Sequence, residues 1–234
     1  MEEELVVKLV KKVELKDNIY KFSFASNDFN DACPGQFLKV RVVDESGIDT
    51  YKSFPIFNID RENSIVEIIF SADDQDSKII ADYEMGDLVN LEGPFGTSFD
   101  VKTKYNSVSI ISEGKNPSPI YELTKELKGN ASLNVYLAFE TEKDVLLERE
   151  LEEIGLNKLC ITTLDGSYKE KGNAIDFMKT DIGEHMVEKI FACGSKEFLE
   201  SVKAYSDEKG ISCEMFIENN MNENGPVISS KDLV

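Results

Sequence analysis

The sequence predicts a two-domain protein, with an N-terminal antiparallel β-barrel over residues 1–100 and a C-terminal α/β domain with a parallel sheet over residues 104–218. Short apolar segments with close turn residues fill the first hundred positions, which is typical of a small antiparallel barrel. From about residue 105, strands alternate with helical segments, as in a parallel sheet covered on both faces. The length of 234 residues allows each half its own core.

In the first half, four segments have the apolar, β-branched and aromatic content of strands. They are residues 5–15, 19–24, 36–43 and 64–70. Turn residues such as Asp17-Asn18, Pro34-Gly35 and Gly86-Asp87 separate the apolar segments. A helix is expected only over residues 77–83. The barrel should therefore end near Phe99, and the second domain should begin near Tyr105.

In the second half, strands are expected over residues 107–111, 133–139, 158–163, 190–193 and 212–217, and helices over 120–127, 144–154, 174–178 and 197–209. Gly210 should end the last of these helices. Parallel sheets bind ligands at the carboxyl ends of their strands. We therefore expect the ligand loops to follow Ile111, Phe139, Thr163 and Cys193.

The chain is strongly acidic, with a net charge of −19. Such a surface repels phosphate backbones and anionic lipid, so it argues against a nucleic-acid or membrane partner. Solubility and docking to a basic partner protein both remain open. No apolar run has the length of a membrane helix, and Met1-Glu2-Glu3-Glu4 lacks the features of a signal peptide. We expect a cytoplasmic protein.

The cysteines Cys33, Cys160, Cys193 and Cys213 are scattered, and no two lie within four residues of each other. This spacing provides no local pair of metal ligands. Cys160 and Cys213 lie in apolar segments and are expected to be buried thiols. The single histidine, His185, is expected at the surface.

Four short motifs occur in a characteristic order. They are Gly93-Pro94-Phe95-Gly96, Asp165-Gly166-Ser167-Tyr168, Ala192-Cys193-Gly194 and Gly225-Pro226-Val227. Their order and context resemble the ferredoxin–NADP reductase superfamily, most of all the electron-transfer subunit of dihydroorotate dehydrogenase. The resemblance implies a barrel that binds FAD, an α/β domain that admits NAD(H), and a C-terminal loop that holds a 2Fe–2S cluster. Gly93 is the cofactor-binding candidate of the first motif.

The resemblance implies a flavin strand at Lys52-Ser53-Phe54-Pro55-Ile56-Phe57. Pro55 and Ile56 fit the pattern, but Phe54 replaces an arginine that would pair with the FAD pyrophosphate. Phe57 replaces a serine that would face the isoalloxazine. Losing the arginine removes a charge-assisted hydrogen bond of about 1.5–3 kcal/mol, and Lys52 could supply only a point charge. The alternative, which we favour, is an ordinary barrel strand.

The resemblance places a second flavin contact at Asp76-Ser77, where the family has Gly-Thr at a helix start. Asp76 would repel a diphosphate, and an N-cap is the alternative reading. In the nucleotide loop, residues 112–119, only Gly114 and Pro119 match the glycine-rich pattern, so nucleotide binding there should be poor.

Two further sites are implied near a nicotinamide nucleotide. Asp165-Gly166-Ser167 fits the family's loop, but Asp-Gly is also a common turn. Cys193-Gly194 fits the family's Cys-Gly-Pro, with Ser195 in place of the proline. A small buried residue at a strand end is the alternative reading of Cys193.

The cluster loop is the clearest departure from the family. Met221 and Gly225-Pro226-Val227 are retained, whereas Asn222-Glu223-Asn224 stands where the cysteines are expected. Because a 2Fe–2S centre needs four ligands, normally thiolates, we predict no such cluster. Residues 219–234 are interpreted as a remnant of the cluster region.

Two functional hypotheses follow. One is an oxidoreductase-like electron-transfer protein that uses FAD and NAD(P)H through diverged loops. The other is a non-catalytic relative that keeps the fold for protein–protein interaction. FAD binding should be weak or absent, and the partner is either a catalytic subunit or a second copy of the chain.

Overall fold

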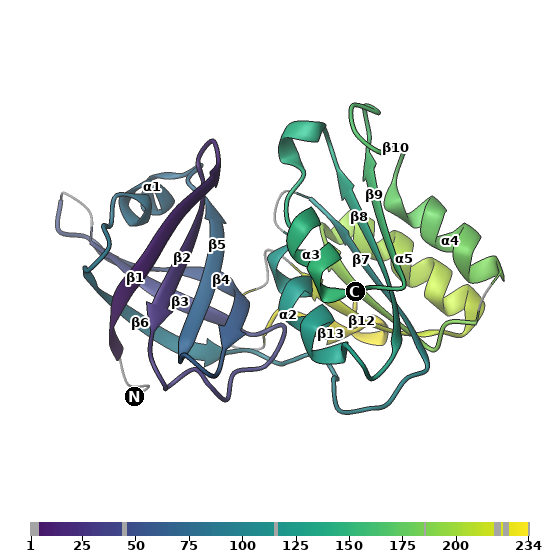
Figure 1. Ribbon diagram of the computed structural model, residues 1–234, viewed down its shortest axis with the longest axis horizontal. Coiled ribbons are helices and arrows are strands. Elements are labelled where there is room, and N and C mark those ends of the chain that lie inside the picture. Colours follow the sequence, from purple (N-terminus) through teal and green to yellow (C-terminus); the bar gives the residue numbers. More distant parts are fainter. Residues whose placement is uncertain are drawn as a thin grey trace.

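The computed structural model describes residues 5–43, 46–114, 117–184, 186–217, 221 and 225–233. It has an N-terminal barrel beside a C-terminal sheet that carries helices on both faces, as the sequence predicts (Figure 1). His185 and Lys115 lie outside the described residues, as do Asn222-Glu223-Asn224. Within the described part of the chain, no helix is long and apolar enough to cross a membrane.

The barrel closes in the order β1-β2-β5-β4-β3-β6, with every neighbouring pair antiparallel. Its elements are β1 (Leu5–Lys16), β2 (Ile19–Ala25), β3 (Phe37–Val43), β4 (Asp49–Asp60), β5 (Ile65–Ser71), α1 (Gln75–Ala81) and β6 (Leu88–Phe95). Alternating residues such as Phe22, Phe24 and Val40 fill its interior. The helix begins two residues before the predicted position, and β6 has no counterpart among the predicted segments.

The second domain is a seven-stranded sheet in the order β10-β9-β8-β7-β11-β12-β13. Its strands are β7 (Ser107–Glu113), β8 (Ser132–Phe139), β9 (Lys158–Thr163), β10 (Glu170–Lys171), β11 (Lys189–Gly194), β12 (Ser212–Ile217) and β13 (Val227–Ser229). All pairs are parallel except β12 and β13. Residues 107–111 and 190–193 pair directly, as the predicted architecture requires.

Helices α2 (Ser118–Leu127) and α3 (Glu148–Ile154) contribute to the core on the sheet face toward the barrel. Helices α4 (Ala174–Glu184) and α5 (Lys196–Lys209) cover the opposite face. Two short 3-10 turns, η1 (Glu142–Asp144) and η2 (Ser230–Asp232), complete the described elements. Gly210 ends α5 with a left-handed φ of 67°, as predicted.

The two largest differences from the predicted helix boundaries lie in the second domain. The segment expected as one helix over residues 144–154 is split, because Leu147 adopts a left-handed φ of 63° and α3 begins only at Glu148. Thr141 and Asp144 form a reciprocal capping box that closes η1 separately. Helix α4 continues to Glu184, six residues beyond the predicted end at Met178.

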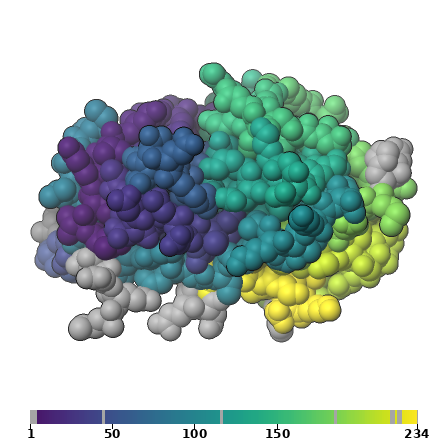
Figure 2. Space-filling view, turned by 60° about the horizontal axis from the view of Figure 1, so that its bottom comes forward, coloured from purple at the N-terminus to yellow at the C-terminus, as the bar shows by residue number. Residues whose placement is uncertain are grey.

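The domains contact each other over a broad seam, with the purple and blue barrel against the teal and green part of the second domain (Figure 2). The linker after β6 contributes Phe99, whose ring packs edge-on against Phe191 of β11 at 5.4 Å. The domain boundaries at residues 100 and 104 stay predictions. Residues 227–229, within the predicted remnant, form the antiparallel edge strand β13.

Candidate functional site: an interdomain groove

A groove of about 500 Å³ lies between the barrel and η1. Its walls are Lys16, Asp17, Asn18, Ile19, Ser71, Asp73, Lys143 and Asp144. Lys16, the last residue of β1, crosses between the domains and donates to the main-chain oxygens of Glu142 (3.3 Å) and Lys143 (2.9 Å). Because these oxygens belong to the 3-10 turn, Lys16 fastens η1 to the barrel at one end of the groove.

A second cavity of about 150 Å³ lies at the carboxyl ends of β7, β8 and β9. Its lining comprises Glu113, Gly114, Ala138, Phe139, Glu140, Asp144 and Leu164. This is where open α/β sheets bind ligands. Asp144 lines both cavities, so they lie on either side of η1. Together they form one candidate site that runs from the barrel to the edge of the sheet.

The predicted nucleotide loop begins at this second cavity. Gly114 follows β7 directly, and its N–H donates to the oxygen of Ala138 at 3.2 Å. Partial burial raises the pKa of Glu113, whose side chain stands where a nucleotide would approach. An acidic group at this place disfavours a phosphate and suits a hydroxyl or a cation.

Two of the predicted diphosphate contacts, Lys52 and Ser77, both bind the side chain of Asp74. Lys52 forms an ion pair with Asp74, which is the N-cap of α1. Asp74 Oδ1 also accepts from the main-chain N of Ser77 (2.9 Å) and from its hydroxyl (3.0 Å). The N-cap is thus Asp74 and not Asp76, which lies inside the first turn. Partial burial raises the pKa of Asp74, but the hydrogen bonds from Lys52 and Ser77 outweigh it and lower the pKa overall.

The flavin-strand residues face away from the groove. Phe54 is 5% exposed and packs in the barrel core at 5.1 Å from Phe70. Ile56 belongs to the same core. Pro55 is buried opposite Phe37 of β3. An arginine at position 54 would therefore place a guanidinium in the barrel interior.

The side chain of Phe57, in contrast, points out of the barrel and contacts the second domain. Strand alternation points Phe57 to the side opposite Ile56, next to a register irregularity against β5 between Ile56 and Asn58. The Phe57 ring is 2% exposed and stacks on Tyr121 of α2, with centroids 4.5 Å apart and planes 24° apart. Two aromatic rings of the chain thus fill the space next to the position where the resemblance implies a flavin-facing serine.

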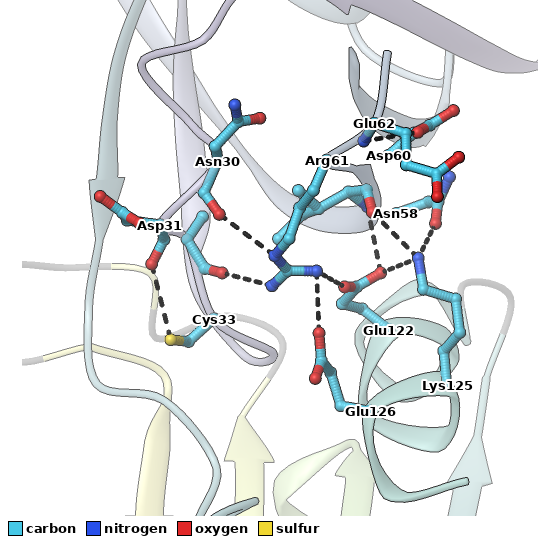
Figure 3. A network of polar contacts seen from close by, with 12 residues as sticks. Asn30, Asp31, Cys33, Asn58, Asp60, Arg61, Glu62, Glu122, Lys125 and Glu126 are labelled. Carbon is cyan, nitrogen blue, oxygen red and sulfur yellow. Dashed lines mark hydrogen bonds and ion pairs between the residues drawn. The ribbon is translucent and has the colours of Figure 1, made fainter. Parts of the chain in front are cut away.

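A buried carboxylate, that of Glu122, follows Tyr121 in α2 and lies within a network of polar contacts (Figure 3). Glu122 of α2 has a fully buried side chain, and its oxygens meet Arg61 Nη1 at 3.1 Å and Lys125 Nζ at 2.7 Å. It also accepts from the main-chain N of Ile59 at 3.0 Å. Arg61 reaches Glu126 at 2.8 Å. Because both cations and a barrel N–H compensate the buried charge, this cluster fixes α2 to β4. We call it the interdomain clamp.

Around the clamp, the cations make further contacts with the barrel. Arg61 donates to the oxygens of Asn30 (3.2 Å) and Ala32 (3.1 Å). Lys125 donates to the oxygen of Ile59 at 3.1 Å and to the side chain of Asn58. Each cation therefore joins the buried carboxylate to main-chain groups across the interface.

The Asp165-Gly166-Ser167 motif forms a turn that supports η1. Asp165 Oδ1 accepts from the N (2.9 Å) and the hydroxyl (2.6 Å) of Ser167. The hydroxyl oxygen of Ser167 accepts from the main-chain N of Glu142 at 2.7 Å. Hydrogen bonding from Ser167 lowers the pKa of Asp165. The motif thus shapes the rim of the candidate site.

Cys193 and Gly194 end β11 next to β7. Cys193 is fully buried and pairs in register with Ser112. A Cβ on Gly194 would lie 2.9 Å from Phe198 Cδ1 and 3.1 Å from the oxygen of Glu113, so glycine suits this close approach. The motif therefore brings β11 against the wall of the second cavity.

None of the four cysteines, which all lie in the described part of the chain, forms a disulfide. Burial raises the pKa of Cys160 to about 11 and that of Cys213 to about 12, which keeps both protonated at neutral pH. In the described part of the chain, no three His, Cys, Asp or Glu residues are grouped to hold a metal ion.

The terminal Gly225-Pro226-Val227 motif has a structural role. A Cβ on Gly225 (φ 81°) would lie 2.4 Å from the N of Thr97, and the Thr97 hydroxyl donates to the oxygen of Val227 at 2.6 Å. Ile217 N donates to the oxygen of Pro226 at 2.9 Å. The segment thus holds β13 against β12 and against the residues that follow β6. Gly93 is also closely packed, since a Cβ there would lie 3.1 Å from the oxygen of Phe37.

Sequence reasoning missed Asp74, the clamp residues Arg61 and Glu122, and Tyr121. Two signals were available. Asp74 lies three positions before Ser77, which is the spacing of a capping hydrogen bond. Glu122 interrupts the apolar positions Ile120 and Leu123, and a charge on a buried helix face needs a partner.

Comparison with known proteins finds no matching family model. The electron transfer subunit of dihydroorotate dehydrogenase B (NAD(+)) from Fusobacterium nucleatum is 29% identical over 210 residues, 86% of this chain and 80% of that protein. The same subunit from Clostridium acetobutylicum is 27% identical over 222 residues, with 94% and 84% covered. The resemblance to these electron-transfer subunits is confirmed.

Solved structures show the same fold. An NADH-dependent reduced ferredoxin–NADP oxidoreductase superposes with a TM-score of 0.82 at 19% identity, covering 99% of this chain and 91% of that one. A ferredoxin NADP+ reductase from Neisseria gonorrhoeae with bound FAD and NADP gives a TM-score of 0.74 at 12% identity, with 97% of each chain covered. The predicted reductase-like fold is confirmed.

Proposed function

We propose that this chain is an electron-transfer protein of the flavin-reductase type, similar in role to the electron-transfer subunits of dihydroorotate dehydrogenase B. The observation that carries the proposal is the pair of neighbouring cavities that share Asp144 as a lining residue. They run from the barrel to the carboxyl ends of β7, β8 and β9, where a dinucleotide suits this fold. By analogy with the relatives, a catalytic subunit would receive or supply the electrons, in the cytoplasm.

The residues at the diphosphate end do not fit a tightly held FAD. Asp73, Asp74 and Asp76 place negative charge around the start of α1, and Lys52 is already paired with Asp74. We therefore expect weak FAD binding and derive no flavin step. The chain's own residues shape the groove. Lys16 and Ser167 hold η1 in place, and Gly194 allows β11 to lie close to Glu113 at the end of β7.

A second candidate function is a non-catalytic shell for protein–protein interaction. The Phe57–Tyr121 stack favours it, because aromatic side chains of the chain itself fill the interface beside the implied flavin position. The interdomain clamp adds to this, since it closes the same side of the interface with buried charge.

Titration of FAD into three purified proteins separates the candidates. Asp74→Ser keeps a capping hydroxyl and releases Lys52. Glu200→Gln on the exposed face of α5 removes the same charge far from the groove and serves as the control. Under the first proposal the wild type binds FAD weakly, Asp74→Ser binds about 10-fold more tightly, and the control resembles the wild type. NADH-dependent ferricyanide reduction should rise in parallel. If neither the wild type nor Asp74→Ser binds FAD, the non-catalytic function is supported.

A further inference from the structure

The exposed aliphatic and methionine side chains of the barrel, residues 5–95, gather on one face. Among the described residues they are Val6, Val10, Val43, Ile48, Met85 and Leu88. They lie on β1, β3 and β6 or directly beside β4 and β6, and none lies on β2 or β5. Leu88 is 71% exposed and Val6 is 61% exposed. We call this surface the outer barrel face.

The strand register makes the face continuous. Lys8 of β1 pairs with Leu88 of β6, and Val6 pairs with Asn90. Directly paired residues project to the same side of a sheet, and positions two apart share that side. Val6, Lys8 and Val10 therefore form one row next to Leu88, while the alternate residues Val7 and Leu9 are buried in the barrel.

The neighbouring strand extends the face on the other side. Lys39 and Val40 of β3 pair with Glu92 and Leu91 of β6. Continuing this register along β3 places Val43 beside Leu88, on the outer side. Apolar residues of β1, β6 and β3 thus adjoin one another across three strands, and an exposed apolar area of this kind marks an interaction site.

Three cations lie on this outer side: Arg41, which pairs with Asp49, Lys39, which lies over the Phe95 ring, and Lys8. Lys8 is exposed and is the register partner of Leu88, and it makes no hydrogen bond or ion pair with any described residue. Lys11, further along β1, is likewise exposed and unpaired among the described residues. In a chain with a net charge of −19, an unpaired lysine beside apolar side chains is complementary to a carboxylate set in an apolar surface.

We propose that the outer barrel face docks a partner protein whose contact surface is apolar and flanked by carboxylates. The carboxylates would meet Lys8 and Lys11, while apolar side chains cover Val6, Val43 and Leu88. The N-terminal part of β1, which carries Val6 and Lys8, lies at the edge of the barrel away from the second domain (Figure 1). The partner would therefore leave the interdomain groove open, and the inference does not rest on flavin or nucleotide binding.

Two other occupants fit less well. A second copy of the chain would pack its own outer barrel face around a two-fold axis. This would bring two Lys8 side chains into one apolar centre and two chains of charge −19 together, both of which are repulsive. An anionic lipid surface would be repelled by the same net charge.

The test uses the full chain with Leu88→Ser, Lys8→Glu and the control Met186→Ser, which alters an exposed methionine of the second domain. Each variant is first checked for an unchanged melting temperature. The tagged chain, expressed in its own host, is used to isolate bound protein. The protein found is then purified and titrated against all four forms.

The expected result is one partner whose affinity falls at least about 10-fold with Leu88→Ser and with Lys8→Glu, but not with Met186→Ser. Cross-links from Lys8 should map to acidic residues of that partner. The proposal is overturned if the variants retain the same proteins as the wild type, or if no partner is found. Self-association of the purified chain that Leu88→Ser abolishes would overturn it, as would wild-type binding to phosphatidylserine vesicles that Leu88→Ser abolishes.

Discussion

The two sides of the domain interface differ in how they are held. On the groove side, a single lysine, Lys16, donates to two main-chain oxygens and leaves about 500 Å³ of open space beside it. On the clamp side, Phe57 stacks on Tyr121, and the buried Glu122 meets two cations and a main-chain N–H. The domain interface is therefore fixed on the clamp side and leaves room for a ligand on the groove side.

The largest effect is expected from breaking the clamp. Arg61→Met leaves the fully buried Glu122 with Lys125 as its remaining cation, and removes two hydrogen bonds to the barrel. We expect a loss of about 3 kcal/mol in the free energy of unfolding, measured with urea. Arg149→Met makes the same substitution at an exposed ion pair with Glu153 and should cost less than about 0.5 kcal/mol. Equal losses would show that the clamp does not fix the interface.

The aromatic stack should contribute less. A double-mutant cycle with Phe57→Leu and Tyr121→Leu should give a coupling energy of about 1 kcal/mol, because stacked rings interact beyond their buried area. The matched cycle replaces Phe57→Leu with Phe54→Leu, since Phe54 packs inside the barrel. Coupling of the same size in both cycles would contradict a specific Phe57–Tyr121 contact.

A smaller effect is expected on the groove side. Lys16→Met removes two hydrogen bonds from a partly exposed lysine, so unfolding should change by only about 0.5–1 kcal/mol. Amide hydrogen exchange should nevertheless increase across η1, which loses its attachment to the barrel. A stability loss as large as that of Arg61→Met would remove the difference between the two sides.

The smallest effect concerns Glu113 and pH. Burial raises its pKa, so the folded chain favours the protonated form. Stability from this group is present below the unfolded pKa and declines as pH rises through the folded pKa. Glu113→Gln should therefore raise the melting temperature slightly at neutral pH, and the gain should vanish at acidic pH. A gain that persists at acidic pH would assign the effect to packing instead.

The architecture can be predicted from the sequence because its signals are local. They are the alternation of apolar residues in strands, the turn residues, and the start of alternating strands and helices near residue 105. Residues 158–163 and 212–217 are strands with the predicted boundaries, and Gly210 ends its helix as expected. α3 begins at Glu148 and not at residue 144 because Leu147 takes a left-handed conformation, which no local sequence pattern predicts.

The candidate site was less predictable because its pairs are distant in the sequence. Phe57 meets Tyr121 because it points to the side of β4 opposite the core residues Phe54 and Ile56, where α2 packs against β4. Lys52 looked available to a phosphate, but its partner Asp74 is twenty-two residues away. Gly225 resembled part of a cluster motif, yet its close approach to Thr97 explains why a glycine is required there.

The most direct test of the central claim is the flavin content of the wild-type protein after reconstitution. The protein is incubated with excess FAD, passed through a desalting column, and examined for bound flavin by its visible absorbance. The Lys52–Asp74 ion pair and the filled Phe57–Tyr121 side predict a colourless protein after desalting. A yellow protein with one FAD per chain, bound at submicromolar affinity, would contradict the claim that these residues do not fit a tightly held FAD.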